Sequence, residues 1–482
     1  MTNEKKRPTL LMALIPIAFL IFLLAINVLI FGSEATEGPN QIALLLASAV
    51  AGIISWRLNN TWDEIEHSMV KSISSAMGAM IILLVIGALS GAWLLSGIVP
   101  AMIYYGLKIL NPTIFLFAAC IVCSIVSLAT GSSWSTVATV GIALLGIGKA
   151  LDINEGVVAG AIISGAYFGD KMSPLSDTTN LAPAMAGTDL FTHVRYMMIT
   201  TIPTLSITLL IFLVWGFTLD TSLGSTDSTA VLNAIDNAFN LNPILFVVPA
   251  LVLFMIVKKV PAVPALLVGA LLGGVFAIIF QPEIVKQISG ITDNPIKSSF
   301  VAVMKAMAMT INIHTDNEMI NGLLTSRGMS GMLNTIWLIL CAMIFGGVME
   351  SAGMLKRIVE EIIKLANSTG SLVASTATTC IFFNLTAGDQ YMAIAVPGRM
   401  FADIYKKRGY KPELLSRTLE DAGTVTSVLI PWNTCGATQS RVLGVATMTY
   451  APYCFFCIIS PLMTVLMAYL NFKIRRLNDK TA

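Results

Sequence analysis

Charged residues are scarce in this sequence. Only 12% of its 482 residues are Asp, Glu, Lys or Arg, whereas 56% are hydrophobic, and the mean hydropathy is +0.80. A soluble domain carries about 25% charged and about 45–50% apolar residues. Because the apolar runs recur from one end of the chain to the other, the composition excludes a soluble enzyme, a disordered chain, a nucleic-acid binder and a single-span anchored protein. The sequence therefore predicts a polytopic membrane protein.

Residues for metal or nucleotide chemistry are also few. The three histidines are scattered, and the two CxxC pairs, Cys120–Cys123 and Cys454–Cys457, lie inside apolar runs, where free cysteine packs as a small hydrophobic residue. A tetrahedral zinc site needs four ligands with a polar shell. The chain has no Walker A sequence, no Rossmann glycine pattern and no HExxH. We therefore expect a chain that is not an enzyme and has no cofactor.

Basic residues mark the sides of the membrane, because cytoplasmic loops carry an excess of Lys and Arg. The central stretch 219–241 contains three Asp and no basic residue, so we expect it outside. The apolar run 10–31 is too long for a signal peptide and no cleavage site follows it, so it reads as an uncleaved first helix. Both termini are expected in the cytoplasm, because both carry clusters of basic residues: Lys5, Lys6 and Arg7 at one end and Lys473, Arg475, Arg476 and Lys480 at the other.

The two halves of the chain share a pattern of glycines and prolines. At a shift of 257 residues, Gly131 coincides with Gly388 and Pro174 with Pro431, and one register with a single one-residue slip holds for about a hundred positions. Because each half starts and ends on opposite sides, similar halves must be inverted. The predicted fold is an all-α polytopic membrane protein of about 10–14 membrane segments, with two inverted-topology repeats and discontinuous helices.

This pattern divides the chain into six parts. They are N-terminal helices at 1–74, the first inverted repeat at 75–218, an external central loop at 219–241, linking helices with an amphipathic segment at 242–331, the second inverted repeat at 332–473, and a cytoplasmic tail at 474–482.

Two apolar runs are interrupted by polar residues in each half. Pro174 and Pro431 lie in equivalent breaks, and because proline removes a backbone donor and clashes with the preceding turn, neither helix can continue unbroken. Freed carbonyls, hydroxyls and the dipoles of half-helix ends suit ions. The interrupted segments are 130–135 and 169–180 in the first half and 386–390 and 431–436 in the second.

Several carboxylates lie in or beside these apolar runs. An Asp at the centre of a membrane helix costs roughly 2.5–3.5 kcal/mol, so such residues are functional by default. For Asp177, the alternative is that its break is an ordinary surface loop. The carboxylates are Asp170, Asp177, Asp389, Glu420 and Asp421.

Structural roles stay open for the other carboxylates. Asp170 is adjacent to Lys171 and could pair with it. Asp389 stands at the start of an apolar run, where Asp commonly caps a helix. Residues 420–421 lie close to Arg417, so an ordinary ion pair is the alternative there.

Five segments resemble the NhaC family of sodium/proton antiporters, within the wider ion transporter superfamily. They are GSSWSTVATVGIA, ISGAYFGDKMSPLSDTTNLA, HTDNEM, LCAMIFGGVMESAGM and LIPWNTCGA. The resemblance covers nearly the whole chain, and GDKMSPLSDTTN is its most specific part. It implies exchange of Na⁺ for H⁺ across a bacterial plasma membrane, whereas some members exchange malate for lactate and others are amino-acid carriers.

Sodium is a hard cation that prefers oxygen ligands. We expect Na⁺ at Asp177, Thr178, Asn433 and Thr434. Burial of a carboxylate favours its neutral form and a bound cation its charged form, so one site can hold either H⁺ or Na⁺. The proton-coupling candidates are Asp170, Asp177, Asp389 and Asp421. The complete predicted ion- or substrate-binding set is Ser132, Ser133, Asp170, Ser173, Asp177, Thr178, Thr179, Asp389, Gln390, Asn433 and Thr434.

Other functions and partners stay open. Lys171, Asn180, Gln390 and Asn433 could bind a carboxylate, which keeps exchange of malate or lactate as the alternative substrate class. An ion channel would need a continuous pore, and saturable counter-ion-dependent flux would exclude it. The expected partners are Na⁺, H⁺ and the lipid bilayer, with no nucleic acid. The small residues at 346–347 suit helix packing within one protomer or between two, so a homodimer is compatible with the sequence.

Overall fold

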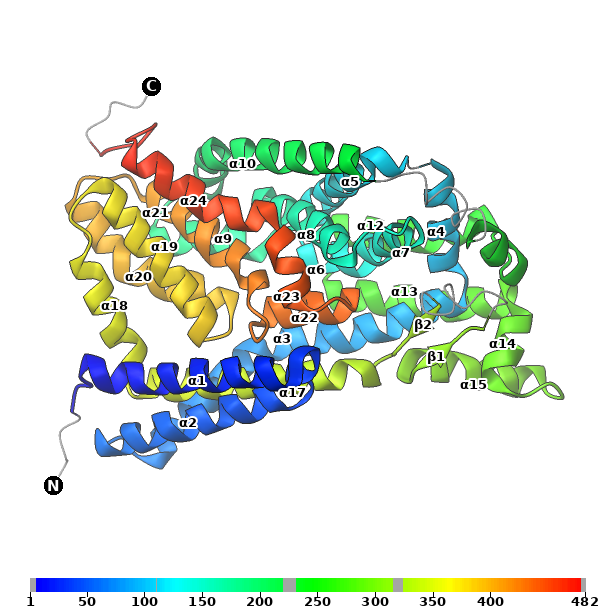
Figure 1. Ribbon diagram of the computed structural model, residues 1–482, viewed down its shortest axis with the longest axis horizontal. Coiled ribbons are helices and arrows are strands. Elements are labelled where there is room, and N and C mark those ends of the chain that lie inside the picture. The colour runs from blue at the N-terminus through cyan, green and yellow to red at the C-terminus, as the bar shows by residue number, and fades with distance from the viewer. Residues whose placement is uncertain (1–5, 110, 220–230, 315–323, 478–482) are drawn as a thin grey trace.

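The computed structural model describes residues 6–109, 111–219, 231–314 and 324–477. Helices dominate this part of the chain (Figure 1). One antiparallel hairpin, formed by β1 (Ile311–Asn312) and β2 (Thr325–Ser326), is the sheet that the described residues contain. The prediction of an all-α chain is confirmed.

Seven described helices are long and apolar enough to cross a membrane. The count rises to nine if each of two bent pairs is one span: Val231–Ala238 with Pro243–Val257, bent by 93°, and Thr447–Tyr453 with Phe455–Tyr469, bent by 55°. The chain is therefore a multi-pass membrane protein. The predicted number of segments was larger because several of those segments fold as shorter or less apolar helices on either side of a break.

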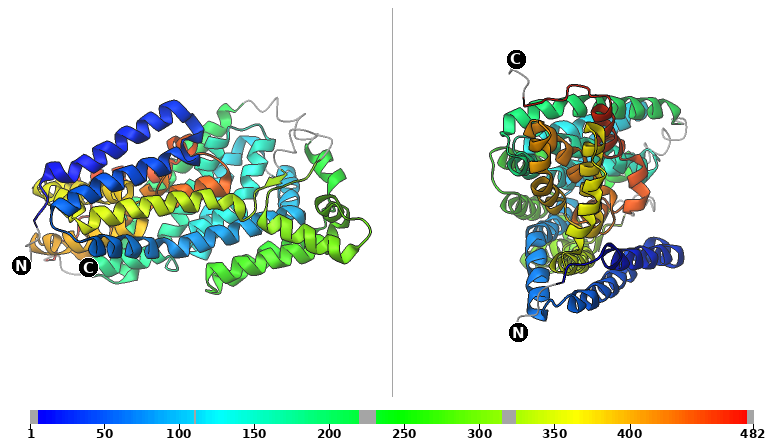
Figure 2. Two further views of the ribbon diagram at one scale, coloured as in Figure 1. Left: turned by 90° about the horizontal axis from the view of Figure 1, so that it is seen from below. Right: turned by 90° about the vertical axis from the view of Figure 1, so that its left-hand side faces the viewer.

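The N-terminal helices form a hairpin that packs on two helices of the second half, α17 (Leu333–Ser351) and α18 (Met354–Lys364). A capping box starts α3, because Thr61 accepts from the Glu64 amide while the Glu64 carboxylate accepts from the Thr61 amide. Figure 2 shows this hairpin on one outer side. Its elements are α1 (Leu10–Phe31), η1 (Gly32–Glu37) and α2 (Pro39–Arg57), followed by α3 (Trp62–Leu95).

Short helices with abrupt ends make up most of the first half. The elements after α3 are α4 (Ile98–Ile109), η2 (Pro112–Ile114), α5 (Phe115–Thr130), α6 (Ser133–Thr136), the π-helical turn η3 (Val137–Gly141), α7 (Ile142–Ala150), α8 (Glu155–Met172), α9 (Asp177–Ala186) and α10 (Leu190–Thr218).

A linking region joins the halves. Asp220 and Asp227 of the predicted central loop lie outside the described residues, and Asp236 lies on the helix Val231–Ala238, so the stretch 219–241 is not wholly a loop. The labelled elements are η4 (Pro243–Phe246), α12 (Val247–Val257), α13 (Ala262–Phe280), α14 (Pro282–Ser289), α15 (Pro295–Ala308), β1, β2 and η5 (Ser330–Met332).

The second half repeats this order of long and short elements. They are α17 (Leu333–Ser351), α18 (Met354–Lys364), α19 (Thr369–Thr386), α20 (Gln390–Lys407), α21 (Pro412–Leu419), the π-helical turn η6 (Glu420–Thr424), η7 (Ser427–Leu429), α22 (Thr434–Leu443), α23 (Thr447–Tyr450), η8 (Ala451–Tyr453) and α24 (Phe455–Tyr469).

Helix boundaries agree between the halves at the shift read from the sequence. The ten residues of α9 coincide with the ten of α22, and each helix ends at a left-handed glycine, Gly187 at φ +84° and Gly444 at φ +68°. Gly131 and Gly388, at φ +69° and +66°, follow α5 and α19. An L side chain disfavours this conformation, so glycine at these four positions sets where the helices stop.

Small residues allow the closest helix contacts. Gly165 and Gly169 on α8 face α5, and a Cβ at Gly165 would overlap the carbonyl oxygen of Cys120. The Ser127 hydroxyl donates to the Ala166 carbonyl oxygen at 2.6 Å across the same interface. Two residues four apart without bulky side chains let membrane helices approach in this way.

The predicted small pair at 346–347 also packs within the protomer. A Cβ at Gly347 would lie 2.8 Å from Cα of Met69 on α3, and one at Gly346 would lie 3.0 Å from Cα of Ala387. These glycines are therefore used inside one chain.

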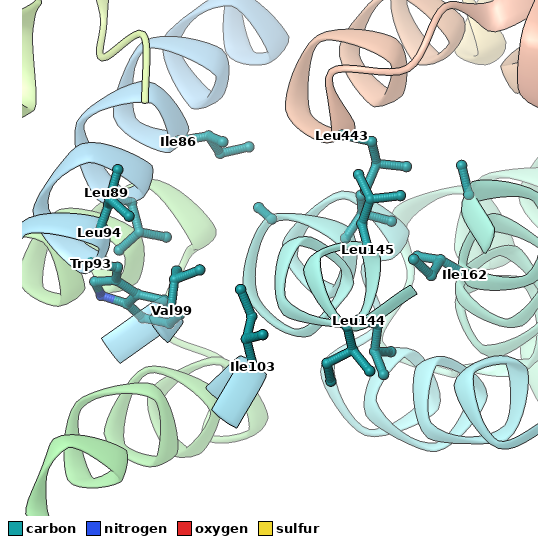
Figure 3. Packing of buried hydrophobic residues seen from close by; sticks show 14 of the residues in the cluster. Ile86, Leu89, Trp93, Leu94, Val99, Ile103, Leu144, Leu145, Ile162 and Leu443 are labelled. Atoms are coloured by element: carbon teal, nitrogen blue, oxygen red, sulfur yellow. The ribbon is translucent and has the colours of Figure 1, made fainter. Parts of the chain in front are cut away.

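Apolar side chains of α3, α4, α7 and α22 belong to one buried cluster. Figure 3 shows Ile86 of α3, Ile103 of α4 and Leu145 of α7 in this cluster, with Leu443 of α22 above them. All four side chains are buried. The core therefore joins the N-terminal part of the first half to the end of a broken helix in the second.

The C-terminal tail docks on the turn between α20 and α21. The amide of Leu477 donates to the Gly409 carbonyl oxygen at 2.8 Å, and the amide of Lys411 donates to the Arg475 carbonyl oxygen at 3.2 Å. The start of α1 and the end of α24 lie at the same end of the molecule (Figures 1 and 2). The two ends of the described chain therefore lie at one end of the molecule.

Candidate functional site

The first break of the first half is closed by a carboxylate from another helix. Asp170, near the end of α8, accepts from the amide of Ser133 at 3.0 Å and from its hydroxyl at 2.6 Å. Ser132 caps the same helix start through the amide of Ser135 at 3.1 Å. Asp170 therefore sits at the N-terminal end of α6, where the helix dipole favours negative charge.

The second break of the first half is held by local hydrogen bonds. Ser173 accepts from the amide of Leu175 at 3.3 Å, and Thr179 donates to the carbonyl oxygen of Lys171 at 3.0 Å. The hydroxyls of Ser176 and Thr178 lie 3.1 Å apart. Carbonyls freed by the interruption are thus partly satisfied by the hydroxyls of the break itself.

The two breaks of the first half touch each other. A Cβ at Gly131 would lie 2.6 Å from Cβ of Leu175, so the first break leaves room for the second only because residue 131 is glycine. Asp177 begins α9, and its side chain is exposed. Asn180 donates to the Pro174 carbonyl oxygen at 2.9 Å and closes the proline turn.

The second half has the same arrangement with a different cap. Asp389 is buried and caps α20 by accepting from the Met392 amide at 3.0 Å, so the capping role considered from the sequence is present. The two breaks meet where the Thr434 amide donates to the Gly388 carbonyl oxygen at 2.8 Å. Trp432 braces the second break by donating to the Leu385 carbonyl oxygen at 2.7 Å.

Asn384 is a site residue that the sequence reasoning missed. It is fully buried, and its amide donates to the Gly423 carbonyl oxygen at 2.7 Å and to Thr426 at 3.0 Å. Asn433 in turn donates to the carbonyl and side-chain oxygens of Asn384, both at 3.1 Å. The available signal was an amide residue inside an apolar run just before a break.

Groups from both halves meet around Tyr391 at the start of α20. Its ring hydroxyl interacts electrostatically with Asp170, Asp177 and Asp389 and with Cys435. Tyr391 and Asp177 are both exposed, whereas Asp389 is buried. Three carboxylates, two from the break 169–180 and one from the break 386–390, therefore share one neighbourhood.

The hydrogen bonds of the predicted sodium ligands stay within their own halves. Thr178 contacts Ser176, while Asn433 and Thr434 bond to residues of the second half. Gln390 is buried beside Asp389. The four-residue sodium set remains a prediction.

Lys171 pairs across the halves and not with its neighbour Asp170. Its ammonium donates to the carboxylate of Asp421 and, at 2.9 Å, to the hydroxyl of Ser460. The same carboxylate oxygen accepts from Thr200 at 3.3 Å. Lys171 and Asp421 are both completely buried, so this is an interior ion pair formed by residues 250 apart in the sequence.

More ionisable groups surround this pair. Arg417 places Nε 3.9 Å from the second carboxylate oxygen of Asp421 and stacks its guanidinium 4.6 Å from the ring centroid of Tyr196. His193 meets the hydroxyl of Ser416 at 2.8 Å. The sequence suggested Arg417 as a partner for 420–421, and the structure adds Lys171 and His193 to that group.

A large cavity reaches the second break of the second half. It measures about 1340 Å³ and lies between the N-terminal hairpin, α3, α7, α17 and α22. Pro431 and Trp432 line it together with the charged residues Glu37, Arg327 and Arg441. The cavity therefore connects a charged surface to a helix break.

Metal-binding clusters of His, Cys, Asp or Glu are absent from the described residues. All seven cysteines are buried and free, as expected from the apolar runs around the CxxC pairs.

Comparison with known proteins matches this chain to one family and to several antiporters. Residues 165–472 match the Na⁺/H⁺ antiporter family. The chain is 37% identical over 431 residues to the Na⁺/H⁺ antiporter NhaC of Alkalihalophilus pseudofirmus, covering 89% of this chain and 90% of that protein. It is 35% identical to the malate-2H⁺/Na⁺-lactate antiporter of Bacillus subtilis, covering 89% of each chain, and 34% identical to the arginine/ornithine antiporter ArcD of Halobacterium salinarum, covering 98% and 94%.

Proposed function

This chain belongs to the Na⁺/H⁺ antiporter family, and we propose that it exchanges Na⁺ for H⁺ across the bacterial plasma membrane as a secondary transporter, with both termini in the cytoplasm. The observation that carries the proposal is the neighbourhood of Asp170, Asp177 and Asp389 around Tyr391. Carboxylates held at broken helices supply the charge and the oxygen ligands that an alkali cation needs.

Sodium binds between the halves in this mechanism. Asp177 and Thr178 supply oxygen ligands from the first half, and Asn433 and Thr434 supply them from the second. The exposure of Asp177 supports access from water. Because a bound cation stabilises ionised carboxylates and a bound proton neutralises them, binding of each ion favours release of the other.

Alternating access follows from the repeated architecture. Each half carries a pair of breaks in contact, between Gly131 and Leu175 in the first half and between Gly388 and Thr434 in the second. We infer that the halves are inverted and rock about the shared neighbourhood, exposing it to one side at a time.

The test is flux through purified protein in sealed proteoliposomes holding an internal pH dye. Addition of external Na⁺ should move protons in wild type, and Asp177→Asn should abolish both this movement and the entry of radioactive Na⁺. Asp152→Asn is the matched control, because Asp152 is an exposed turn residue at φ +55° that asparagine tolerates. Unchanged exchange in Asp177→Asn would remove Asp177 from the site, and no proton movement in wild type would refute Na⁺/H⁺ exchange.

The cavity favours a second candidate, in which an organic carboxylate is exchanged together with the ions. Its volume of about 1340 Å³ exceeds the roughly 300–1,000 Å³ of common small-molecule pockets and is far larger than Na⁺ requires. Arg441 lies 3.6 Å from Glu37, and its Nε has no hydrogen-bond partner among the described residues. A guanidinium suits a carboxylate. Proton movement only when malate or lactate is added would support this candidate.

A further inference from the structure

A second polar cluster lies in the interior, apart from the residues that cap the breaks. It joins α8, α10, α21 with its π-helical turn, and α24. The completely buried charged residues there are Lys171, Arg417, Glu420 and Asp421. Burying this many ionisable groups in a membrane protein is costly and points to ion or proton movement.

Asp421 is the better-satisfied carboxylate of this cluster, although its oxygen Oδ2 has no hydrogen-bond partner among the described residues and lies 3.9 Å from Nε of Arg417. One of its oxygens accepts from Lys171, from Ser460 at 3.2 Å and from Thr200 at 3.3 Å. An ionised carboxylate with three donors is stable in its charged form. Asp421 is therefore a fixed counter-ion to Lys171.

Glu420 differs from Asp421 in its hydrogen bonding. Both carboxyl oxygens are buried, and neither has a hydrogen-bond partner in the described part of the chain. An ionised carboxylate in that state would be strongly destabilised. This environment therefore favours the protonated form of Glu420.

A nearby cation makes the ionised form of Glu420 attainable as well. Arg417 lies three residues before Glu420 on the same helix, and none of its three guanidinium nitrogens has a hydrogen-bond partner among the described residues. Lys171, Arg417 and Asp421 together leave one excess positive charge. Loss of the Glu420 proton would cancel that charge, so both protonation states are compatible with the cluster.

The surroundings of Glu420 reach the first break. It lies within electrostatic range of Asp170 and Lys171 of α8, of Asp421 of its own turn and of Cys380 of α19, and the hydroxyl of Thr424 is close to it. The other ionisable side chains of the cluster are His193 and Tyr196 of α10 and Arg417. Glu420 is thus within electrostatic range both of the carboxylate that caps α6 and of the interior ion pair.

The backbone at Glu420 differs from that at the equivalent position of the first half. Glu420 begins a π-helical turn, Glu420–Thr424, and π-helical turns are frequent at functional sites. At the shift of 257 residues, Glu420 and Asp421 correspond to Ile163 and Ser164 in a regular helix. The first half therefore has no counterpart of these carboxylates.

We propose that Glu420 carries the exchanged proton at a site distinct from the sodium ligands of the breaks. The proposal rests on Na⁺/H⁺ exchange as the proposed function. Lys171, Asp421 and Arg417 position Glu420 and balance its charge, and Asp170 couples it electrostatically to the sodium site. A sodium ion bound near Asp170 would then favour the ionised form of Glu420 and so the release of its proton.

The experiment measures two fluxes in the same proteoliposomes. One is Na⁺-driven proton movement, and the other is exchange of radioactive Na⁺ for unlabelled Na⁺, which requires no proton. We expect Glu420→Gln to reduce proton movement to the background of empty liposomes while Na⁺/Na⁺ exchange stays at the wild-type rate. Glu413→Gln is the matched control, since Glu413 is a buried glutamate on the same helix whose carboxylate pairs with Arg475 at 3.3 Å. It should keep both fluxes.

Each outcome decides the matter. Wild-type proton movement in Glu420→Gln, or loss of both its fluxes, overturns the proposal, whereas a wild-type protein without Na⁺-driven proton movement overturns Na⁺/H⁺ exchange itself. If Glu420→Gln is not recovered in folded form, Glu420→Asp decides. It retains the carboxyl group one methylene further back, so a shifted pH midpoint of proton movement supports the proposal and an unchanged midpoint overturns it.

Discussion

Replacing one partner of the ion pair between Lys171 and Asp421 should destabilise the protein more than replacing both partners together. The perturbations are Lys171→Met, Asp421→Asn and the double variant. Both side chains are completely buried, so solvent does not screen their attraction. Each single variant changes the net charge of the buried cluster by one, whereas the double variant keeps the net charge of the wild type.

The structure sets the expected magnitude. Removal of one partner of a buried ion pair costs about 3–5 kcal/mol. Lys171→Met should fall near the lower end, because Arg417 lies 3.9 Å from Asp421 and partly balances the remaining charge. Asp421→Asn leaves Lys171 with the hydroxyl of Ser460 at 2.9 Å and should cost more. The coupling between the two positions should lie in the range of about 0.5–3 kcal/mol.

Thermal unfolding in detergent can be followed with a dye that reacts with thiols. All seven cysteines are buried, so dye reaction reports loss of the fold. We expect the stability order wild type, double variant, Lys171→Met, Asp421→Asn. Ser206→Ala is a suitable control, because Ser206 is exposed on α10 and its hydroxyl bonds only to the carbonyl oxygen of Ile202 in its own helix among the described residues.

The double variant provides the decisive comparison. If its loss of stability equals the sum of the two single losses, Lys171 and Asp421 act independently and the reasoning is wrong. Single variants as stable as wild type would also contradict a charged pair in the interior.

Two further predictions concern the breaks. Gly131→Ala should destabilise the protein more than Gly187→Ala. Both positions have positive φ, which costs an L residue about 1–2 kcal/mol, but only at residue 131 would the new methyl group collide with a neighbour, Leu175. Equal shifts in unfolding temperature would contradict this prediction. Asn384→Ala should cost about 1–3 kcal/mol and lower Na⁺/Na⁺ exchange, because Asn433 and the Gly423 carbonyl lose buried partners, whereas unchanged stability would show that these groups re-pair.

Much of the fold was readable because it depends on backbone chemistry. Proline restricts the backbone at residues 174 and 431, and glycine permits the positive φ found at residues 131 and 388, so the spacing of these residues in the sequence carried over directly to the ends of helices. Apolar composition likewise fixed the helical class, since membrane spans must satisfy their own backbone groups. The number of spans was less readable, because interrupted helices and crossings give similar apolar runs.

Side-chain partners were much less readable. Lys171 has Asp170 beside it in the sequence but pairs with Asp421 in space, because Asp170 is engaged by Ser133 at 2.6 Å. Nothing local to Lys171 indicates a partner 250 residues away. Asn384 was missed for the same reason, since its three partners come from segments beyond its own helix.

The two halves therefore agree where the backbone is constrained and differ where charge is placed. Equivalent glycines end equivalent helices, but the interior carboxylates at 420–421 correspond to Ile163 and Ser164 in the first half. A perfectly symmetric pair of halves would offer two equivalent ion sites. With the buried carboxylates confined to one half, sodium and proton can occupy different places while remaining coupled through Asp170. Retention of Na⁺/Na⁺ exchange after neutralisation of Glu420 would be the direct consequence of that asymmetry.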